Sequence, residues 1–184
     1  MPRTRTSEGW LDLAVVLDLF SRMVVGWAMA EHMRGELTLA ALNMAIARQR
    51  TSRGLTHHSD RGSQYAATAY RAALASIGAH CSMSRRGDPF DNAPMESFFK
   101  TLRAELADDA NYATHAEARR DVFAFLEAWY NRQRLHSAIG YITRIPPVTA
   151  AYPCCGEPAL VPTGVLWSAV KDGGGWRDGD HHRG

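Results

Sequence analysis

The sequence has no long hydrophobic run, few cysteines and almost no lysine. No stretch of its 184 residues approaches the roughly 18 apolar residues of a membrane-spanning helix, and the opening MPRTRTSEGW lacks the apolar segment of a signal peptide. The three cysteines are Cys81 and the adjacent pair Cys154 and Cys155, which form neither a disulfide framework nor a spaced zinc pattern. We therefore expect a cytoplasmic protein, and the cysteines do not indicate an oxidising compartment.

The charge is too small to identify a partner. The net charge is +2 and the sequence pI is about 8.5, which does not by itself indicate nucleic-acid binding. Arginine accounts for 19 of the 21 basic residues, a bias that fits a GC-rich genome as well as selection for phosphate binding. A hydrophobic content of 46% is enough for the core of one domain.

Alternating apolar residues predict two strands near the N-terminus. Residues 11–17, LDLAVVL, place every second side chain on one face, as in a strand with one packed side. A second β-rich run at residues 23–30 follows a group of turn-forming residues. Together the two runs predict an antiparallel hairpin.

Helices and short strands alternate after this hairpin. Thr114 and Glu117 form a capping box that predicts the start of a last helix. Before it, the pattern predicts helices at 36–48, 68–77 and 95–106 and strands at 55–59 and 80–84. This order indicates a mixed α/β domain over residues 1–152. The Pro- and Gly-containing remainder, residues 153–184, is predicted to be a poorly ordered C-terminal extension.

Two carboxylates occupy positions typical of a metal site. Asp60 follows the strand at 55–59, and Glu96 follows Pro94 in a first helical turn, where the helix dipole favours the ionised form. Carboxylates placed in this way can converge on Mg²⁺ or Mn²⁺, which would activate a water or a 3′-hydroxyl in phosphodiester cleavage or transfer. Acidic pairs are common, and Asp60 also fits a simple turn cap, so the spacing alone leaves both interpretations open.

Four longer stretches are more specific than this spacing. HHSDRGSQY, SMSRRGDPFDNAPMESFFKTLRAEL and YNRQRLHSAIGY resemble three signature blocks of the transposases of insertion-sequence family 3, and LAVVLDLFSRMVVGWAM resembles two strands of their catalytic domain. The resemblance covers about residues 6–150. It implies an RNase H-like fold, as in retroviral integrase, in which a mixed sheet is flanked by helices.

The resemblance also implies a catalytic site. Members of this family carry two aspartates and a glutamate, with 35 residues between the second aspartate and the glutamate, and the same number separates Asp60 from Glu96. By this match Asp60 and Glu96 are the catalytic residues and metal ligands, with Mg²⁺ or Mn²⁺ as cofactor. The implied partner is DNA, as transposon ends and target, and the implied place of action is the bacterial nucleoid.

Basic residues in the same blocks are implied as DNA contacts. Lys100 and Arg103 lie one and two helical turns beyond Glu96 and are expected on its face. The aromatic pair Trp129 and Tyr130 precedes further basic residues, and we interpret this pair as core. The full set of implied DNA-binding residues is Arg85, Arg86, Lys100, Arg103, Arg132, Arg134 and His136.

The chain departs from the family at its beginning. In the family the first aspartate lies on a strand just before the segment that opens this chain, and no equivalent is found. Asp12 and Asp18 also precede Asp60, but we interpret Asp18 as a turn residue and Asp12 as a solvated one. We therefore expect an N-terminally truncated catalytic core that lacks its first strand and is inactive alone.

Two other functions remain open from the sequence. The first is a non-enzymatic fragment that binds DNA or intact transposase as an inhibitor, or that forms a homo-oligomer. The second is a small zinc protein that uses His57, His58, Cys81 and the pair Cys154 and Cys155. Adjacent cysteines rarely both bind one tetrahedral ion, which disfavours zinc.

Overall fold

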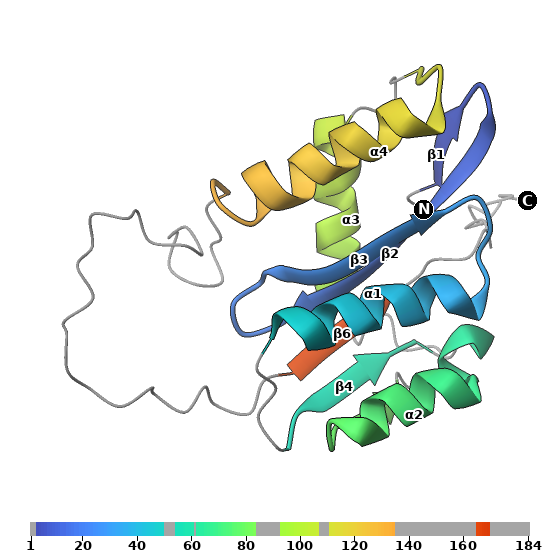
Figure 1. Ribbon diagram of the computed structural model, residues 1–184. Coiled ribbons are helices and arrows are strands. Elements are labelled where there is room, and N and C mark those ends of the chain that lie inside the picture. Colours follow the sequence, from blue (N-terminus) through green and yellow to red (C-terminus); the bar gives the residue numbers. More distant parts are fainter. Residues whose placement is uncertain are drawn as a thin grey trace, which may run out of the picture.

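One mixed sheet organises the chain (Figure 1). The computed structural model describes residues 3–49, 54–60, 62–83, 93–106 and 111–134, and the backbone of 165–169. Within these residues the strand order is β1-β2-β6-β4-β5. Strand β3 lies off this path and also pairs with β2. The strands are β1 (Arg3–Thr6), β2 (Gly9–Asp18), β3 (Val24–Ala30), β4 (Thr56–Ser59), β5 (His80–Met83) and β6 (Val165–Ala169).

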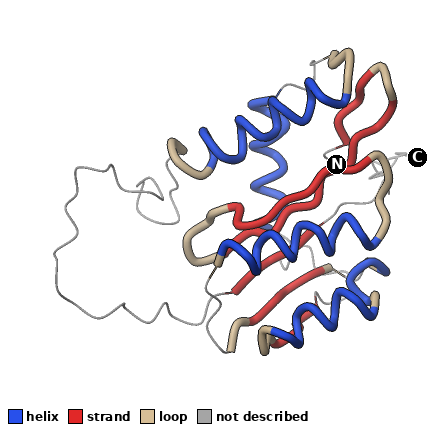
Figure 2. The backbone as a smooth tube through the Cα atoms, in the orientation of Figure 1, coloured by secondary structure: helices blue, strands red, loops and turns tan. Residues whose placement is uncertain are grey.

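The helices lie in two groups on either side of this sheet (Figure 2). They are α1 (Gly35–Arg48), the short 3₁₀ turn η1 (Ser63–Ala66), α2 (Thr68–Ser76), α3 (Ala93–Leu106), α4 (His115–Phe123) and its π-helical continuation η3 (Ala124–Tyr130). None of the helices in the described ranges is both long enough and apolar enough to cross a membrane.

Alternation along β2 explains the two groups. Leu13, Val15 and Leu17 point to one face and pack against α3, α4 and η3, while Ala14 and Val16 point to the other face and pack against α1. Successive side chains of a strand point to opposite faces, so a strand that is apolar at every position is buried on both sides. The sheet is therefore the middle of three layers, with α2 beside α1.

Helix α1 packs unusually close to β3 because of Gly26. A Cβ atom at this position would lie 2.2 Å from the carbonyl oxygen of Ala41 and 2.7 Å from the backbone nitrogen of Ala45, both in α1. No side chain fits in that space. Gly26 therefore sets the distance between this helix and the sheet.

The N-terminus of α4 is capped as the sequence predicts. Thr114 Oγ1 accepts a hydrogen bond from the Glu117 backbone N–H at 3.2 Å, which satisfies one of the free amides of a first helical turn. The Glu117 carboxylate accepts from the Ala113 N–H at 3.0 Å rather than from Thr114 itself. The return hydrogen bond of this capping box therefore comes from the residue before the N-cap and not from the N-cap itself.

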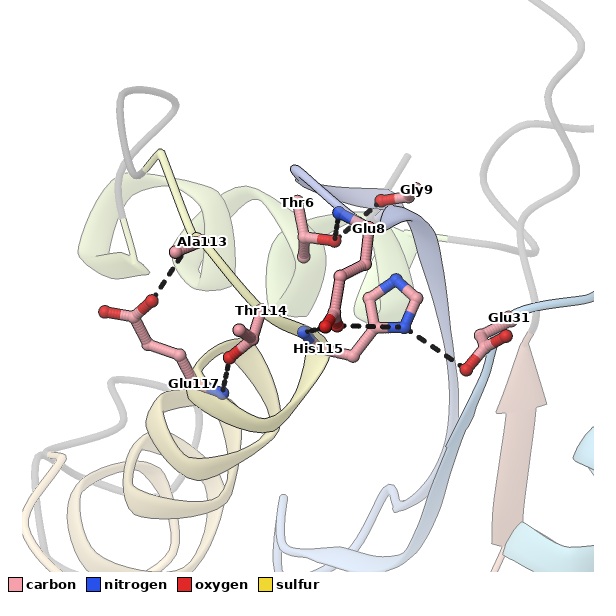
Figure 3. A network of polar contacts seen from close by, with 8 residues as sticks. All are labelled: Thr6, Glu8, Gly9, Glu31, Ala113, Thr114, His115 and Glu117. Atoms are coloured by element: carbon pink, nitrogen blue, oxygen red, sulfur yellow. Dashed lines mark hydrogen bonds and ion pairs between the residues drawn. The ribbon is translucent and has the colours of Figure 1, made fainter.

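This helix start is fastened to the β1–β2 hairpin (Figure 3). The Glu8 carboxylate, in the hairpin turn, accepts a 2.6 Å hydrogen bond from the backbone N–H of His115. The His115 ring is buried, and its Nδ1 lies 3.2 Å from Glu31 Oε1, just beyond β3. Two carboxylates on neighbouring loops therefore hold the first turn of α4 against one end of the sheet.

Most elements agree with the sequence predictions, and β6 is the main difference. The hairpin at 11–30 is confirmed as β2 and β3, and the helices and short strands lie within two residues of their predicted ends. Strand β6, however, lies in the segment predicted to be an extension, yet it pairs with both β2 and β4. Its five residues, VLWSA, are too few for a clear period, although Val, Leu and Trp suit a strand.

Candidate functional site

Asp60 lies at the carboxyl end of β4 and is half-buried. Its Oδ1 accepts a 2.8 Å hydrogen bond from the Gly62 backbone N–H, which closes a tight turn after the strand. In β4, His57 and Ser59 are buried, and His57 faces α2. Asp60 itself follows the last residue of this strand. The turn-cap interpretation and the metal-ligand interpretation of Asp60 are thus compatible.

The two histidines before Asp60 are occupied with other contacts. His57 is 1% exposed, and its Nε2 lies 3.0 Å from the Tyr70 hydroxyl. Burial, assisted by the nearby His58, lowers the pKa of His57 from 6.5 to about 4. His58 Nδ1 pairs with Ser82 Oγ on β5 at 2.9 Å. Neighbouring strand positions point these rings to opposite faces, and within the described part of the chain no three metal-binding side chains gather, so the zinc hypothesis gains no support.

Glu96 lies in the first turn of α3 and is exposed. The opposite face of this helix is anchored in the core by Met95, Phe98, Phe99 and Leu102. That packing fixes the rotation of α3 and leaves Glu96 on its solvent side. The start of α3 therefore presents an exposed carboxylate.

A basic stripe continues along α3 from Glu96. Lys100 and Arg103 are exposed, as is Glu96, and positions four and seven residues apart lie above one another on a helix. All three residues lie within α3. Arg85 and Arg86, the expected loop contacts, lie outside the described residues.

Further basic side chains follow η3. The Arg134 guanidinium lies over the rings of Trp129 and Tyr130, at 5.7 and 5.6 Å from their centroids, an arrangement that holds its charge in place. Arg132 is exposed. Tyr130 is buried in the core and Trp129 packs beside it, which confirms the prediction that this pair is structural. His136 lies outside the described residues.

The two upstream aspartates differ from each other. Asp18 accepts hydrogen bonds from the Phe20 and Ser21 backbone amides and from the Ser21 hydroxyl, which confirms its interpretation as a turn residue. Asp12 was expected to be solvated, and this is wrong: its side chain is 3% exposed. The expectation failed because β2 has two packed faces and is flanked at this point by both β1 and β3.

The carboxylates of Asp60 and Glu96 suit a hard divalent cation that also binds oxygen atoms of a substrate and of water. Mg²⁺ is commonly held by one or two carboxylates together with substrate phosphates and waters, and Asp60 and Glu96 are two carboxylates of this kind. Glu96 is exposed, so its carboxylate is accessible to a bound polyanion such as DNA. The residues present therefore fit a metal site that a nucleic-acid backbone would complete.

One neighbour of this site was not found from the sequence. Strand β6 runs beside β4, with Ser59, the residue before Asp60, opposite Ser168. The only sequence signal was the β-forming run at 165–167. Such a signal carries no information on which strand it will pair with, because that pairing is non-local.

Comparisons with known proteins show the family and the fold of this chain. Two family models, both described as integrase core domain, match residues 3–89 and 77–143. A chain of the simian T-cell lymphotropic virus intasome, solved in complex with PP2A regulatory subunit B56 gamma, has a similar fold, with a TM-score of 0.58 and 18% identity over 85% of this chain and 57% of that one. The mixed sheet flanked by helices is thus an RNase H-like fold, as predicted.

Curated relatives are proteins of bacterial insertion sequences. The transposase for IS904 of Lactococcus lactis is 46% identical over 136 residues, which is 74% of this chain and 54% of that protein. The IS600 uncharacterized 31 kDa protein of Shigella sonnei is 47% identical over 75% of this chain and 51% of its own length. The InsF transposase for IS3A of Escherichia coli is 43% identical over 74% and 47%.

The chain spans about half the length of these relatives. The matched region includes both Asp60 and Glu96 within the integrase core models. The fold, the signature blocks and the relatives all agree, and the chain belongs to the integrase core domain family, as a catalytic core of the IS3 type of insertion-sequence transposase.

Proposed function

We propose that this chain is the metal-binding and DNA-contacting core of a transposase that cleaves and joins DNA strands. The observation that supports the proposal is that Asp60 follows the end of β4 and that Glu96 lies, exposed, in the first turn of α3. These two carboxylates would hold Mg²⁺ or Mn²⁺. A metal in this position supplies Lewis-acid activation of an attacking oxygen and stabilises the leaving oxygen.

The protein residues position these reactants. The Gly62 amide fixes the Asp60 carboxylate through Oδ1, so that this ligand is oriented before DNA binds. Glu96 lies in the first turn of α3, at the positive end of the helix dipole. In the reaction, the oxygen of a water or a 3′-hydroxyl would bond to phosphorus as the bond from phosphorus to the leaving oxygen breaks, and the nucleophile's proton would pass to solvent.

The basic side chains would bind the DNA backbone. Lys100 and Arg103 extend from Glu96 along one exposed stripe of α3, which would place phosphates next to the carboxylates. Arg134, held over two aromatic rings, and Arg132 would extend this surface beyond η3. Arg85, Arg86 and His136 belong to the same proposal through the family blocks. Contacts of this kind position DNA without reading its sequence.

Metal-dependent DNA binding tests the proposal on the chain itself. Anisotropy of a fluorescent DNA duplex would be measured with and without Mg²⁺, for the wild type and for Asp60→Asn and Glu96→Gln. We expect Mg²⁺ to tighten binding by the wild type and to have no such effect on either variant. Glu105→Gln, at the far end of α3, is the control and should behave as the wild type. Equal tightening in all four proteins would contradict the proposal.

The salt dependence of the same binding tests the basic stripe. Removing one side chain that binds a phosphate should lower the slope of log K against log salt by about 0.9, so Lys100→Gln and Arg103→Gln should each reduce it by about that amount. Arg71→Gln, on α2 at the other face of the sheet, is the matched control. If Arg71→Gln lowered the slope as much as the stripe variants, the DNA surface would have to lie elsewhere.

A binding-only function is the alternative. It is favoured by one observation: within the described ranges, no three acidic, histidine or cysteine side chains form a group that could hold a metal ion. A chain with this site alone would bind DNA, or an intact transposase, without completing strand transfer. We accordingly expect no strand transfer by the isolated chain, as judged by joining of a labelled DNA end to a plasmid.

A further inference from the structure

One asparagine fastens the end of η3 to the edge of the sheet. The Asn131 amide accepts a hydrogen bond from the Val24 N–H and donates one to the Val24 C=O, both at 2.9 Å. Among the residues that the structure describes, β3 pairs with β2 alone, so this amide takes the place of a neighbouring strand at Val24. Both residues are buried, and buried backbone groups require such partners.

A π-helical turn leads to Asn131. Its backbone N–H bonds to the carbonyl of Leu126, five residues earlier, at 3.1 Å. Tyr130 packs in the core, and the next side chain, Asn131, is also buried. Turns of this kind are rare and often occur at functional sites. The chain leaves η3 immediately after this turn.

The turn after Asn131 folds Arg134 back over the helix. The N–H groups of Gln133 and Arg134 both donate to the Trp129 carbonyl, at 2.8 and 3.0 Å. The Arg134 guanidinium then lies over the rings of Trp129 and Tyr130, at 5.7 and 5.6 Å from their centroids. Stacking occupies one face of a guanidinium and leaves the N–H groups at its edge available to a phosphate. The cation is thus held in place before DNA binds.

A separate set of contacts holds the earlier part of η3. The Glu127 carboxylate accepts hydrogen bonds from Trp27 Nε1 at 2.8 Å and from the Arg48 guanidinium at 2.6 Å. These contacts do not involve Asn131. Removing the Asn131 side chain should therefore release the last turn of the helix and leave the rest in place.

We propose that Asn131 is a positioning residue for DNA binding, which acts by holding Arg134 in the orientation that binds one DNA phosphate. Asn131 is 4% exposed, so its own side chain is not accessible to DNA. Arg134 follows it by three positions, in the turn that the Trp129 carbonyl closes. Without the anchor, Arg134 would keep its charge and lose its fixed position, and ordering it again on binding would cost affinity. The inference rests on the proposed role of Arg134 in binding DNA.

A double-mutant cycle tests this coupling. The anisotropy of a fluorescent DNA duplex gives the affinity of the wild type, Asn131→Ala, Arg134→Gln and the double variant, without Mg²⁺ and under conditions in which circular dichroism shows each protein folded. Arg134→Gln should weaken binding by about tenfold. Asn131→Ala should weaken binding by about fivefold in the wild-type background. It should have no further effect in the Arg134→Gln protein, because the two residues act as one unit.

Gly26→Ala is the matched control. It should also destabilise the fold, but its Cβ would meet α1 and not η3. The affinity of this variant for DNA should therefore equal that of the wild type. A purely structural role of Asn131 would instead give the same loss of affinity with and without Arg134.

Three results would each overturn the inference: equal losses from Asn131→Ala in both backgrounds, no loss from Asn131→Ala, or no loss from Arg134→Gln. Should Asn131→Ala fail to fold, Asn131→Ser, whose hydroxyl can bond to one of the two Val24 groups, must show a loss that disappears in the Arg134→Gln protein. The cycle contains no metal. A wild type that binds DNA without a response to Mg²⁺ would thus contradict the metal site of the proposed function and leave this inference standing.

Discussion

Acidification should destabilise this protein through His57. The ring is buried beneath α2, and burial lowers its pKa in the folded protein from 6.5 to about 4. The unfolded chain therefore binds a proton between these two pH values while the folded chain does not. Stability from this residue is complete above about pH 6.5 and is lost as the pH falls toward 4.

The size of the effect follows from the pKa difference. A shift of one unit corresponds to 1.36 kcal/mol, so the change from 6.5 to about 4 removes about 3 kcal/mol once the pH is below 4. At pH 5 the loss relative to pH 8 is about 2 kcal/mol. This is a large part of the stability of a typical domain.

Urea denaturation at pH 8 and pH 5 measures this loss. The wild type and His57→Asn would be compared, with His32→Asn as the control because His32 is an exposed histidine. Carboxylates titrate in all three proteins, so the difference between variants isolates His57. We expect His57→Asn to lose about 2 kcal/mol less than the others between these pH values. An identical loss in all three would refute the reasoning.

Three substitutions test the packing described above, each measured by urea denaturation. Gly26→Ala should destabilise the fold by about 2–3 kcal/mol because its Cβ would overlap the backbone of α1; a neutral result would show that α1 can move away. Asn131→Ala should lose about 2–4 kcal/mol, since the Asn131 amide bonds both the N–H and the C=O of Val24 at 2.9 Å, and a loss below 1 kcal/mol would contradict that role. Thr114→Ala removes the cap that accepts the Glu117 amide and should lose about 1 kcal/mol, whereas Thr101→Ala on α3 should be closer to neutral.

Local patterns predicted the elements well because their causes are local. The alternation at residues 11–17 and the helical spacing at 36–48 each depend on neighbouring residues, and both elements occur as predicted. The cap at Thr114 is of the same kind. The periodicity of hydrophobic residues and the helix cap therefore predicted most of the helices and strands.

Predictions failed where the cause was distant in the sequence. Burial of Asp12 depends on β1 and β3 closing over both edges of β2, and the place of β6 depends on a gap between two strands that lie far from it in the chain. Neither fact is visible in a short window. The site lies between these cases: the residue blocks predicted Asp60 and Glu96 as a pair, whereas the burial of His57 against Tyr70 of α2 depends on packing between distant elements.

Calorimetric titration with Mn²⁺ tests the central claim most directly. If Asp60 and Glu96 form a metal site, MnCl₂ added to the wild-type chain should bind with a saturable heat. Asp60→Asn and Glu96→Gln should each weaken that binding by at least about tenfold, in the range seen when metal-site residues are altered, and Glu105→Gln should not. Saturable binding that is unchanged in both variants, or its absence from the wild type, would contradict the account.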